Sequence, residues 1–528
     1  MREVDRLTTE RFGVPSLTLM ENAATRTVEA LEQLFGDVRG KRALIICGIG
    51  NNGGDGASIA RLLHQKGAAV DVLLLGRIED SKGDASTNFE NALEIANHAK
   101  PGFRFVAIGT KERFWQEATS NSHSLFIDAI FGTGLTRPAS GLFEEAIHLF
   151  NDHTGGLPVI SVDLPSGIAS DSHELIGPAV KANLTVTFTA PKIGIVMPPA
   201  SDYCGRVVIA SIGSPEELIN ASECRLNLIQ RSDAARWLAT SRRDAHANKG
   251  DVGKVLIVAG SIGKSGAACL AGEAALRAGC GLVTIATSAS SQPVVASSVI
   301  AECMTEALAE TSTGAVSREA ADRVLELAAE RDVVAIGPGL GSAHESTRTL
   351  VRAVTMKRGR PMVIDADALN SLAPWAENLK GSAELPMILT PHPGEMARLV
   401  SKSIADVTRN PIDTARDFAI ARGVILVLKG SPSVVAAPDG QVYVNSTGNA
   451  GMATGGTGDV LTGMIASFVA QTPNDPPGAT IAAVYLHGLA GDIAASKLGV
   501  RPMIASDITS HLGEAFISAG GDAERLVR

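Results

Sequence analysis

The chain has 528 residues, enough for two or three domains that each bury a core of their own. Hydrophobic residues make up 45% of it and charged residues 20%, as in soluble globular proteins, and a net charge of -9 gives no electrostatic reason to expect nucleic acid or an anionic membrane as a partner. No run of about 18 consecutive apolar residues is present, and residues 1–10 lack an apolar signal segment, so we expect a cytoplasmic protein without a membrane span. The six cysteines include no CxxC pair, which argues against a zinc site or a disulfide framework.

The first part of the chain has the pattern of a parallel α/β sheet. Short β-branched runs bounded by glycine alternate with helix-compatible stretches. The predicted strands are residues 43–47, 70–75, 125–130, 159–162, 184–188 and 207–212. The alternation stops in residues 214–249, which are more polar and in which we predict no comparable strand. We therefore place a domain junction near residue 225, which gives domains of residues 1–225 and 226–528.

A second α/β series follows the junction. Its strands are predicted at residues 255–258, 282–286, 333–336, 362–364, 387–389 and 425–428. These runs are apolar throughout, as in strands of a parallel sheet buried on both faces. Residues 434–437 and 442–444 flank an Asp-Gly turn, which predicts a β-hairpin. The fold class expected from both series is α/β, with two doubly wound sheets.

A glycine loop directly follows the first predicted strand. Residues 48–56 read GIGNNGGDG and satisfy the GxGxxG pattern, whose backbone N–H groups bind phosphate at a helix start. The acidic residue that dinucleotide-binding loops place about 20 residues further on is only approximated by Asp71. A dehydrogenase is therefore disfavoured, while a phosphate-binding loop and a plain strand-to-helix turn both remain open.

Polar side chains follow several strands of the first series. Asn52, Asp128, Asp163 and Ser166 all come at or just after predicted strand ends. Ligands of open α/β sheets bind beyond the carboxyl ends of the strands, so these four residues are expected in one crevice. Oxygen ligands of this kind suit a hard cation or a proton transfer. The alternative for the two aspartates is that they only cap turns or helices.

The first 215 residues resemble the NAD(P)H-hydrate epimerase family. The resemblance lies in four ordered motifs: LMENAA at residues 19–24, the NNGGDG loop, FGTGL at 131–135 and VDLPSG at 162–167. It implies a Rossmann-like domain with Asp163 as catalytic acid/base and a potassium ion held by Asn52, Asp128 and Ser166. It also implies substrate contacts at Asn51, Asn52, Gly53, Gly54, Asp55, Gly132, Thr133, Gly134, Leu135, Thr136, Arg137, Pro138 and Asp163.

A second glycine loop stands near the end of the chain. Residues 448–459 read GNAGMATGGTGD and precede an apolar, helix-like stretch. Small residues that open a helix leave backbone N–H groups free to bind a phosphoryl group, and Asp459 then stands where it could accept a hydroxyl proton. A flexible turn is the alternative. Residues 260–265 end like a P-loop, but two residues separate the glycines where that motif has four, so we reject a Walker motif.

Other polar residues also follow strands of the second series. Lys429 and the residues up to Ser433 are favoured for nucleotide contact, although Lys429 as a solvated strand end is the alternative. His392, between two prolines, is as consistent with a structural hydrogen bond as with function. Asp365 and Asp367 are weaker candidates.

Residues 225–528 resemble the NAD(P)H-hydrate dehydratase family, which is ribokinase-like in fold. The segments that carry this resemblance are NKGDVGKVLIVAGS, SGAA, RAGCGLVTIAT, GPGLG, IDADALN, TPHPGE, LKGS and GGTGDVLTG. It implies contacts to hydrated nicotinamide at Gly341, His392 and Asp459, the last being catalytic. It implies nucleotide contacts at Lys429, Gly430, Ser431, Pro432, Ser433, Asn449, Ala450, Gly451, Met452, Ala453, Thr454, Gly455, Gly456, Thr457 and Gly458.

Together the two resemblances imply a bifunctional repair enzyme. Its first domain would interconvert the R and S forms of hydrated NADH and NADPH, and its second would dehydrate the S form at the expense of ADP with Mg²⁺. The residues do not distinguish ADP from ATP; the fused arrangement favours ADP. We further expect a homo-oligomer. Two alternatives stay open: a sugar or vitamin kinase with a non-catalytic Rossmann-like binding domain, and a first domain that only serves as a scaffold.

Overall fold

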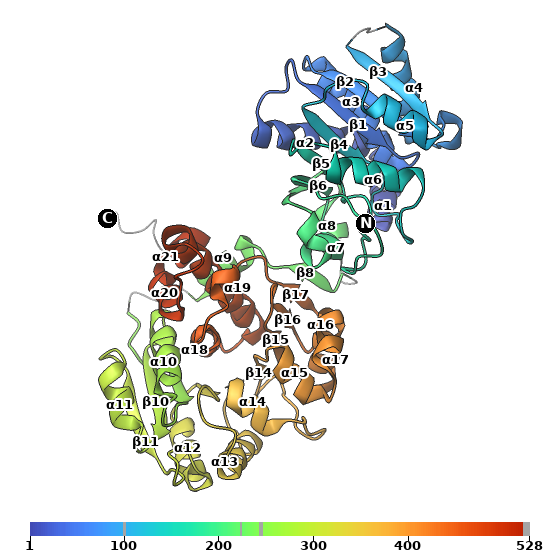
Figure 1. The fold of residues 1–528 in the computed structure, drawn as a ribbon. Helices are drawn as coiled ribbons and strands as arrows, with labels where there is room; N and C mark the ends of the chain where they lie inside the picture. The colour runs from blue at the N-terminus through green and yellow to red at the C-terminus, as the bar shows by residue number, and fades with distance from the viewer. Residues whose placement is uncertain (99–101, 222–223, 242–245, 521–528) are drawn as a thin grey trace. The chain divides into compact units, whose positions relative to one another are not determined.

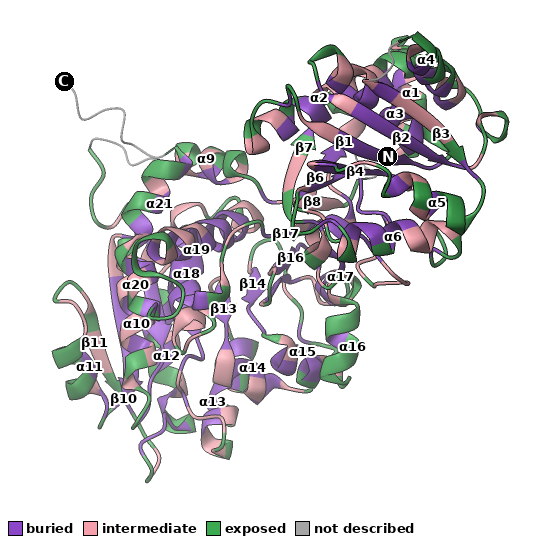
Figure 2. Cartoon of the chain, turned by 45° about the horizontal axis from the view of Figure 1, so that its top comes forward, coloured by how far each residue is buried: buried purple, intermediate pink, exposed green. Residues whose placement is uncertain are grey.

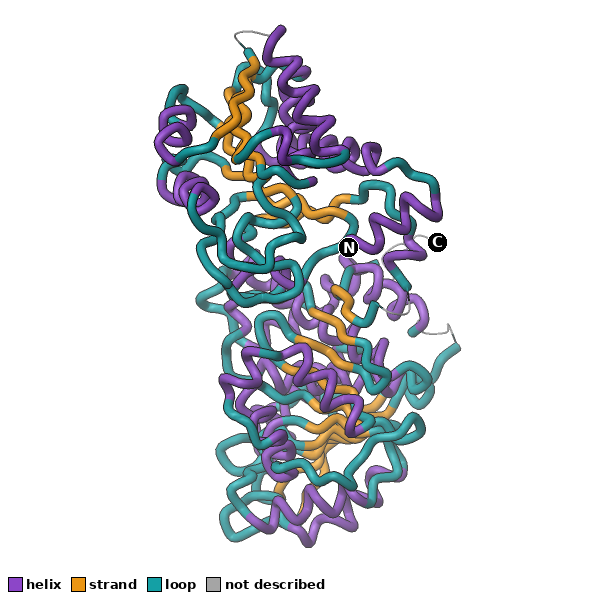
Figure 3. Tube along the Cα trace, turned by 90° about the vertical axis from the view of Figure 1, so that its right-hand side faces the viewer, coloured by secondary structure: helices purple, strands orange, loops and turns teal. Residues whose placement is uncertain are grey.

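The computed structural model describes residues 1–98, 102–221, 224–241 and 246–520. The chain divides into two compact units, Met1–Cys224 and Arg225–Arg528 (Figure 1). Each unit is a sheet flanked by helices (Figure 3). The α/β class predicted for both halves is confirmed.

The first unit alternates strands and helices. Its strands are β1 (Arg42–Cys47), β2 (Ala69–Leu75), β3 (Phe103–Ile108), β4 (Leu125–Ala129), β5 (Val159–Val162), β6 (Leu184–Phe188) and β7 (Arg206–Ala210). Its helices are α1 (Arg2–Phe12), α2 (Ser16–Phe35), α3 (Asn51–Gln65), α4 (Asp84–His98), α5 (Lys111–Ala118), α6 (Leu142–Asp152), α7 (Ile193–Val196) and α8 (Glu216–Ile219).

The seven strands are parallel and run in the order β3-β2-β1-β4-β5-β6-β7. Alternate residues of the strands face opposite sides. In β1, Ile45 and Cys47 pack with α2, α3 and α4 in one core, whereas Leu44 and Ile46 pack with α5 and α6 in another. The strand order reverses between β1 and β4, so the loops after these two strands diverge and leave a crevice at their carboxyl ends.

The second unit is larger. Its strands are β8 (Leu226–Leu228), β9 (Lys254–Val258), β10 (Leu282–Ser288), β11 (Met304–Leu308), β12 (Val333–Ile336), β13 (Met362–Ile364), β14 (Met387–Leu389), β15 (Ile425–Leu428), β16 (Val434–Ala436) and β17 (Val442–Val444). Its helices are α9 (Arg231–Thr240), α10 (Ser265–Arg277), α11 (Gln292–Ser298), α12 (Ala321–Ala329), α13 (Glu345–Met356), α14 (Ala366–Leu372), α15 (Pro393–Val400), α16 (Ile404–Arg409), α17 (Pro411–Arg422), α18 (Thr457–Gln471), α19 (Pro476–Leu498), α20 (Ala505–Ser510) and α21 (Leu512–Ala519).

The second sheet has ten strands in the order β11-β10-β9-β12-β13-β14-β15-β16-β17-β8. All neighbours are parallel except β15–β16 and β16–β17, so the predicted hairpin is present. Its main core joins the sheet to α10, α18 and α19. Figure 2 shows α18 as almost wholly buried, whereas α16 is largely exposed. α18 is buried from Val460 to Ala470, so the helix that follows the second glycine loop is anchored in the core.

Three strands were not predicted, and one of them corrects an expectation. β8 lies within residues 214–249, where we expected no strand; its three residues pair in parallel with β17. β8 and β11 form the edges of their sheet and β3 forms an edge of the other. Edge strands are partly exposed and carry polar residues, so they lack the continuous apolar pattern of central strands.

One described helix, α19, is long and apolar enough by composition to cross a membrane. Of its most apolar 18-residue window, 72% is buried within the protein. The same helix contributes Ala482, Leu486 and Ala490 to the core of the second unit. Burial in that core accounts for its apolar composition.

Candidate active sites

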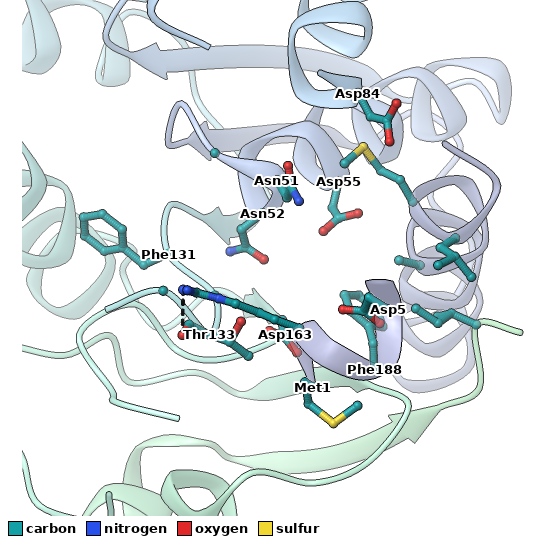
Figure 4. A pocket seen from close by; sticks show the side chains of 18 of the residues that line it. Met1, Asp5, Asn51, Asn52, Asp55, Asp84, Phe131, Thr133, Asp163 and Phe188 are labelled. Atoms are coloured by element: carbon teal, nitrogen blue, oxygen red, sulfur yellow. Dashed lines mark hydrogen bonds between the residues drawn. The ribbon is translucent and has the colours of Figure 1, made fainter. Parts of the chain in front are cut away.

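A cavity of about 510 Å³ lies at the crevice of the first unit (Figure 4). Its walls come from the start of α3, the loop after β4, Asp163 after β5, Lys192 after β6, and α1. Figure 4 shows Asn52 and Asp55 of α3 and Asp163, which follows β5, pointing into it. The sheet therefore brings together residues that lie more than 100 positions apart in the sequence, as the strand-end argument predicts.

The first glycine loop brings Asn52 into this cavity by close backbone packing. A Cβ atom at Gly53 would lie 1.8 Å from the carbonyl oxygen of Gly48, so only glycine fits there. Asn52 is 8% exposed, and neither its amide nitrogen nor its oxygen has a hydrogen-bond partner within the described residues. Because a buried amide without partners is costly, this side chain is arranged for a ligand.

Asp163 faces the cavity from a strained position. Its φ of 65° is uncommon for a residue other than glycine, and such strain persists only where the surroundings impose it. Its Oδ1 accepts a hydrogen bond from Lys192 Nζ at 2.5 Å. A Cβ atom at Gly132 would lie 3.0 Å from Asp163 Oδ2 and 3.3 Å from Asn52 Oδ1, so both side chains border the same space. The absence of a side chain at Gly132 keeps that space open.

Lys192 is a site residue that the sequence argument did not single out. Its Nζ also donates to Thr187 Oγ1 at 2.8 Å and to the carbonyl oxygen of Phe188 at 3.0 Å, and the side chain is 5% exposed. It lies a few residues after the predicted strand 184–188, and that position was the available signal. A buried ammonium beside Asp163 stabilises negative charge on that carboxylate.

Asp128 and Ser166 lie behind the cavity wall, not on it. Ser166 donates from both its backbone N–H and its hydroxyl to Asp128, at 2.8 and 2.5 Å, and Ser161 Oγ donates to the same carboxylate at 2.9 Å. Burial raises the pKa of Asp128, while these hydrogen bonds oppose the shift. The pair joins the loop after β4 to the loop after β5, because Ser166 Oγ also accepts from the N–H of Phe131.

Asp55 and Asp5 add two carboxylates to the cavity. Burial, followed by repulsion from Asp163, raises the pKa of Asp55 well above its usual value. Burial also raises the pKa of Asp5, which comes from α1. Of the predicted substrate contacts, the residues that line the cavity are Asn51, Asn52, Asp55, Gly132, Thr133, Gly134 and Asp163. Gly53, Gly54, Leu135, Thr136, Arg137 and Pro138 are absent from its lining.

The second unit gathers an acid/base centre at the carboxyl ends of its strands. Lys429, after β15, donates to Asp365 Oδ1 at 2.8 Å, and Thr462 Oγ1 of α18 donates to Asp365 Oδ2 at 2.8 Å. Asp365 is 1% exposed, so it links the sheet to the helix that begins at the second glycine loop. Burial and the nearby Asp365 raise the pKa of Asp459 to about 7. Asp459 thus has the pKa of an effective general base near neutral pH.

Lys429 keeps its charge in this buried centre. Burial lowers the pKa of Lys429, but the carboxylates of Asp365 and Glu395 outweigh burial and the net shift is upward. A Cβ atom at Gly458 would lie 3.2 Å from Lys429 Nζ, so glycine there lets the ammonium reach the start of α18. A positive charge beside a helix amino end is suited to bind a phosphoryl group.

Two residues of α19, which the sequence argument did not single out, hold the second glycine loop in place. Asp492 of α19 accepts from the N–H of Gly448 and from Asn449 Nδ2, both at 2.9 Å. His487, also of α19, lies 3.1 Å from the carbonyl oxygen of Thr457, and burial lowers its pKa to about 4. His487 is therefore neutral and fixes the first turn of α18. No motif marks these two residues, because their role depends on how α19 packs.

Two further predicted contacts are placed by hydrogen bonds. Asp367 Oδ2 accepts from the N–H of Gly341 at 2.8 Å and from Lys264 Nζ at 3.2 Å, which holds the loop after β12 near the loop after β9. His392 Nδ1 accepts from the N–H of Gly394 and caps α15, while its ring remains half exposed. His392 thus has the structural role weighed above, and its Nε2 lies 3.5 Å from Glu395 Oε1.

Comparison with protein families assigns both halves of the chain. Residues 16–194 match the model of the YjeF-related protein N-terminus, and residues 255–513 match that of NAD(P)H-hydrate dehydratase. A bifunctional NAD(P)H-hydrate repair enzyme of Moorella thermoacetica is 42% identical over 100% of this chain and 97% of its own length. The chain belongs to the bifunctional NAD(P)H-hydrate repair enzyme family.

Other members of this family match over nearly the whole chain. The enzyme of Thermofilum pendens is 36% identical, covering 99% of this chain and 96% of its own. That of Escherichia coli is 33% identical, covering 97% and 92%. Both resemblances stated from the motifs are thereby confirmed.

Solved structures were also found for the second half. An ADP/ATP-dependent NAD(P)H-hydrate dehydratase from Bacillus subtilis, co-crystallised with ATP and Mg²⁺, is 31% identical and covers 56% of this chain and 99% of its own, with a TM-score of 0.48. A ribokinase-like superfamily protein from Enterococcus faecalis is 25% identical and covers 57% and 98%, also with a TM-score of 0.48.

Proposed function

We propose that this chain repairs hydrated NADH and NADPH with two separate active sites. Residues 1–225 would interconvert the R and S hydrates, and residues 226–528 would convert the S hydrate back to the reduced dinucleotide with ADP. The observation that carries the proposal is that each unit holds its own acid/base centre, Asp163 with Lys192 in the first and Asp459 with Lys429 in the second. Full-length relatives that carry the repair name support it.

The first site is suited to moving one proton. The hydrate carries a hydroxyl on the ring carbon beside nitrogen, and a bond at that carbon breaks readily because the nitrogen lone pair stabilises the resulting cation. Asp163 Oδ2 borders the open space beside Gly132, while Oδ1 is held by Lys192. In the proposed step, Asp163 in its acid form gives a proton to the hydroxyl as the C–O bond breaks and water leaves. Water then adds to the other face of the cation and returns the proton to Asp163.

Potassium in the first site is part of the proposal. Asn52 supports it, because its buried oxygen has no partner among the described residues and an amide oxygen is a ligand for hard cations. Asp128 and Ser166, whose oxygens are already hydrogen-bonded to each other, would complete the set from behind the wall. The ion would supply positive charge near the reacting hydroxyl.

The second site is suited to phosphoryl transfer followed by elimination. In the proposed sequence Asp459 accepts the hydroxyl proton as the oxygen attacks the terminal phosphorus of ADP, giving AMP and a phosphate ester of the hydrate. The C–O bond then breaks, phosphate leaves with its electron pair, and loss of a proton from the neighbouring carbon restores the reduced ring. Lys429 and the N–H groups that open α18 would hold the transferring group.

The donor is proposed to be ADP bound with Mg²⁺. Among the described residues, no group of three or more His, Cys, Asp or Glu side chains could hold a metal ion. Magnesium would therefore arrive on the nucleotide phosphates, where it neutralises charge. The cytoplasmic location and the homo-oligomeric state stay predictions from the sequence.

The kinase alternative is weaker. A sugar or vitamin kinase would leave the first unit without a reaction, yet that unit holds a strained aspartate, a buried lysine and an unpartnered amide around one cavity. The same features argue against a scaffold role for the first unit. Relatives matched along both units carry the repair name and none of those described above is a kinase.

One measurement tests the proposed function. The purified chain is mixed with hydrated NADH and either ADP or ATP, and the near-ultraviolet band of reduced nicotinamide is followed. Recovery of that band with a nucleotide, and not without one, is the expected result. No recovery of the band with either nucleotide would contradict the proposal.

A further inference from the structure

Helix α1 adds a cation to the cavity of the first unit. Arg2 and Asp5 both line the cavity, as expected for residues three apart on one helix face. Arg2 Nη2 donates to the carbonyl oxygen of Thr133 at 3.3 Å, a bond drawn as a dashed line in Figure 4. The match of this unit to its family model spans residues 16–194 and so does not reach α1.

The cavity is otherwise rich in acidic side chains, although burial favours the neutral form of Asp5 and Asp55. Four carboxylates line it: Asp5, Asp55, Asp84 and Asp163. Its basic side chains, within the part of the chain that is described, are Arg2 and Lys192. A phosphate group would be repelled by the ionised carboxylates of this lining unless a cation meets it.

Lys192 is not free to meet a phosphate. An ammonium has three donors, and Lys192 gives them to Asp163, Thr187 and Phe188. Arg2 makes a single side-chain hydrogen bond and no ion pair with the described residues. Since a guanidinium has five donors in a planar fork, Arg2 keeps most of its binding capacity for a ligand.

We propose that Arg2 binds a phosphate of the hydrated dinucleotide and so sets the affinity of the first site for its substrate. This inference rests on the function proposed for the first unit. Arg2 lies against the backbone of the Gly132–Gly134 loop, beside the space that Asp163 and Asn52 border. Anchoring the charged part of the substrate there would leave the nicotinamide end free to reach Asp163. Arg2 thus determines binding and takes no part in the proton transfer.

The test compares Arg2→Gln with Arg6→Gln in the full-length chain. Arg6 is on the same helix but pairs with Glu3 and Glu10, is half exposed and does not line the cavity. One epimer of hydrated NADH or of hydrated NADPH is supplied without nucleotide, which keeps the second site silent, and its conversion is followed by chromatography. We expect Arg2→Gln to raise KM by about 10-fold with kcat within about twofold, and Arg6→Gln to change neither.

Comparing hydrated NADH with hydrated NADPH shows which phosphate Arg2 contacts. An equal rise in KM for both assigns Arg2 to the diphosphate, whereas a rise only for hydrated NADPH assigns it to the additional phosphate; either result supports the proposal. Arg2→Lys should recover part of the affinity, because a point charge remains. An unchanged KM for both substrates in an active Arg2→Gln variant would overturn this inference but not the proposed function. A wild-type chain that interconverts no epimers would overturn the proposed function, and this inference with it.

Discussion

At the scale of single residues, Asp459 should give the dehydration its pH dependence. Burial and Asp365 raise its pKa to about 7, so the group is protonated below that pH and cannot accept the hydroxyl proton. We therefore expect kcat/KM for recovery of NADH to fall as the pH drops through about 7, approaching about tenfold per pH unit. A pH series with saturating ADP measures this. A flat profile from about pH 5.5 to 8.5 would argue that Asp459 is not the base.

Lys192 allows a second prediction at this scale. Lys192→Met removes the ammonium that holds Asp163 Oδ1, so the carboxylate loses its buried partner and its orientation. We expect epimer interconversion to slow by about 100-fold or more, with ADP-dependent dehydration of the pure S hydrate unchanged. Lys66→Met is the matched control, because Lys66 pairs with Glu32 on the surface of the same unit. Equal epimerisation rates in the two variants would show that Lys192 plays no part in epimerisation.

The sequence indicates Asp163 and Asp459 and, beside Asp459, Lys429 and Asp365, but it does not indicate Lys192 or His487. Asp163 and Asp459 stand in motifs, at the end of a strand and at the start of a helix. Lys192 acts through its contact with Asp163 and His487 through its contact with the backbone of Thr457, and neither stands in a motif that the sequence argument used. Because such contacts depend on how elements pack, local patterns contain no signal for them.

At the scale of elements, the start of α18 depends on one glycine. Gly456 has a φ of 93°, and a Cβ atom there would lie 2.5 Å from Leu270 Cδ1. Gly456→Ala should therefore lower stability by about 1–2 kcal/mol and displace the N–H groups that face the nucleotide. The rate of ADP-dependent dehydration should fall, and the rate of epimerisation should not change.

The adjacent glycine is the control for that prediction. A Cβ atom at Gly455 would meet nothing within 4 Å, so Gly455→Ala removes a neighbouring glycine without a clash. Thermal unfolding and ADP-dependent recovery of NADH measure both variants. If Gly456→Ala had the same unfolding temperature and the same rate of NADH recovery as Gly455→Ala, the close packing of this loop would contribute to neither stability nor dehydration.

Elements were predictable where they are buried. The central strands β5, β12, β13 and β15 begin and end where the apolar runs do, because burial on both faces demands apolar residues throughout. The edge strands β3, β8 and β11 were not predicted, because they are partly exposed and carry polar residues. The motifs of the candidate sites follow strands that were predicted, among them β1, β5, β15 and β17, so the candidate sites could be proposed although three edge strands were not predicted.

At the scale of the whole molecule, the two sites should fail separately and complement each other. Asp163→Ala leaves the second unit intact, and Asp459→Asn leaves the first intact, since each residue belongs to a different compact unit. A mixture of the two full-length variants should therefore repair both epimers in one fast phase, whereas neither variant alone should. A mixture no better than the two variants measured separately would contradict the independence of the sites.

The time course of Asp163→Ala tests the central claim most directly. An equal mixture of R and S hydrates is given excess ADP, and the band of reduced nicotinamide is followed. For the wild type we predict one fast phase to completion. For Asp163→Ala we predict a fast phase that recovers about half of the band, then a slow phase at the rate of uncatalysed epimerisation. A variant that recovers the whole band in one fast phase would contradict an epimerase in the first unit.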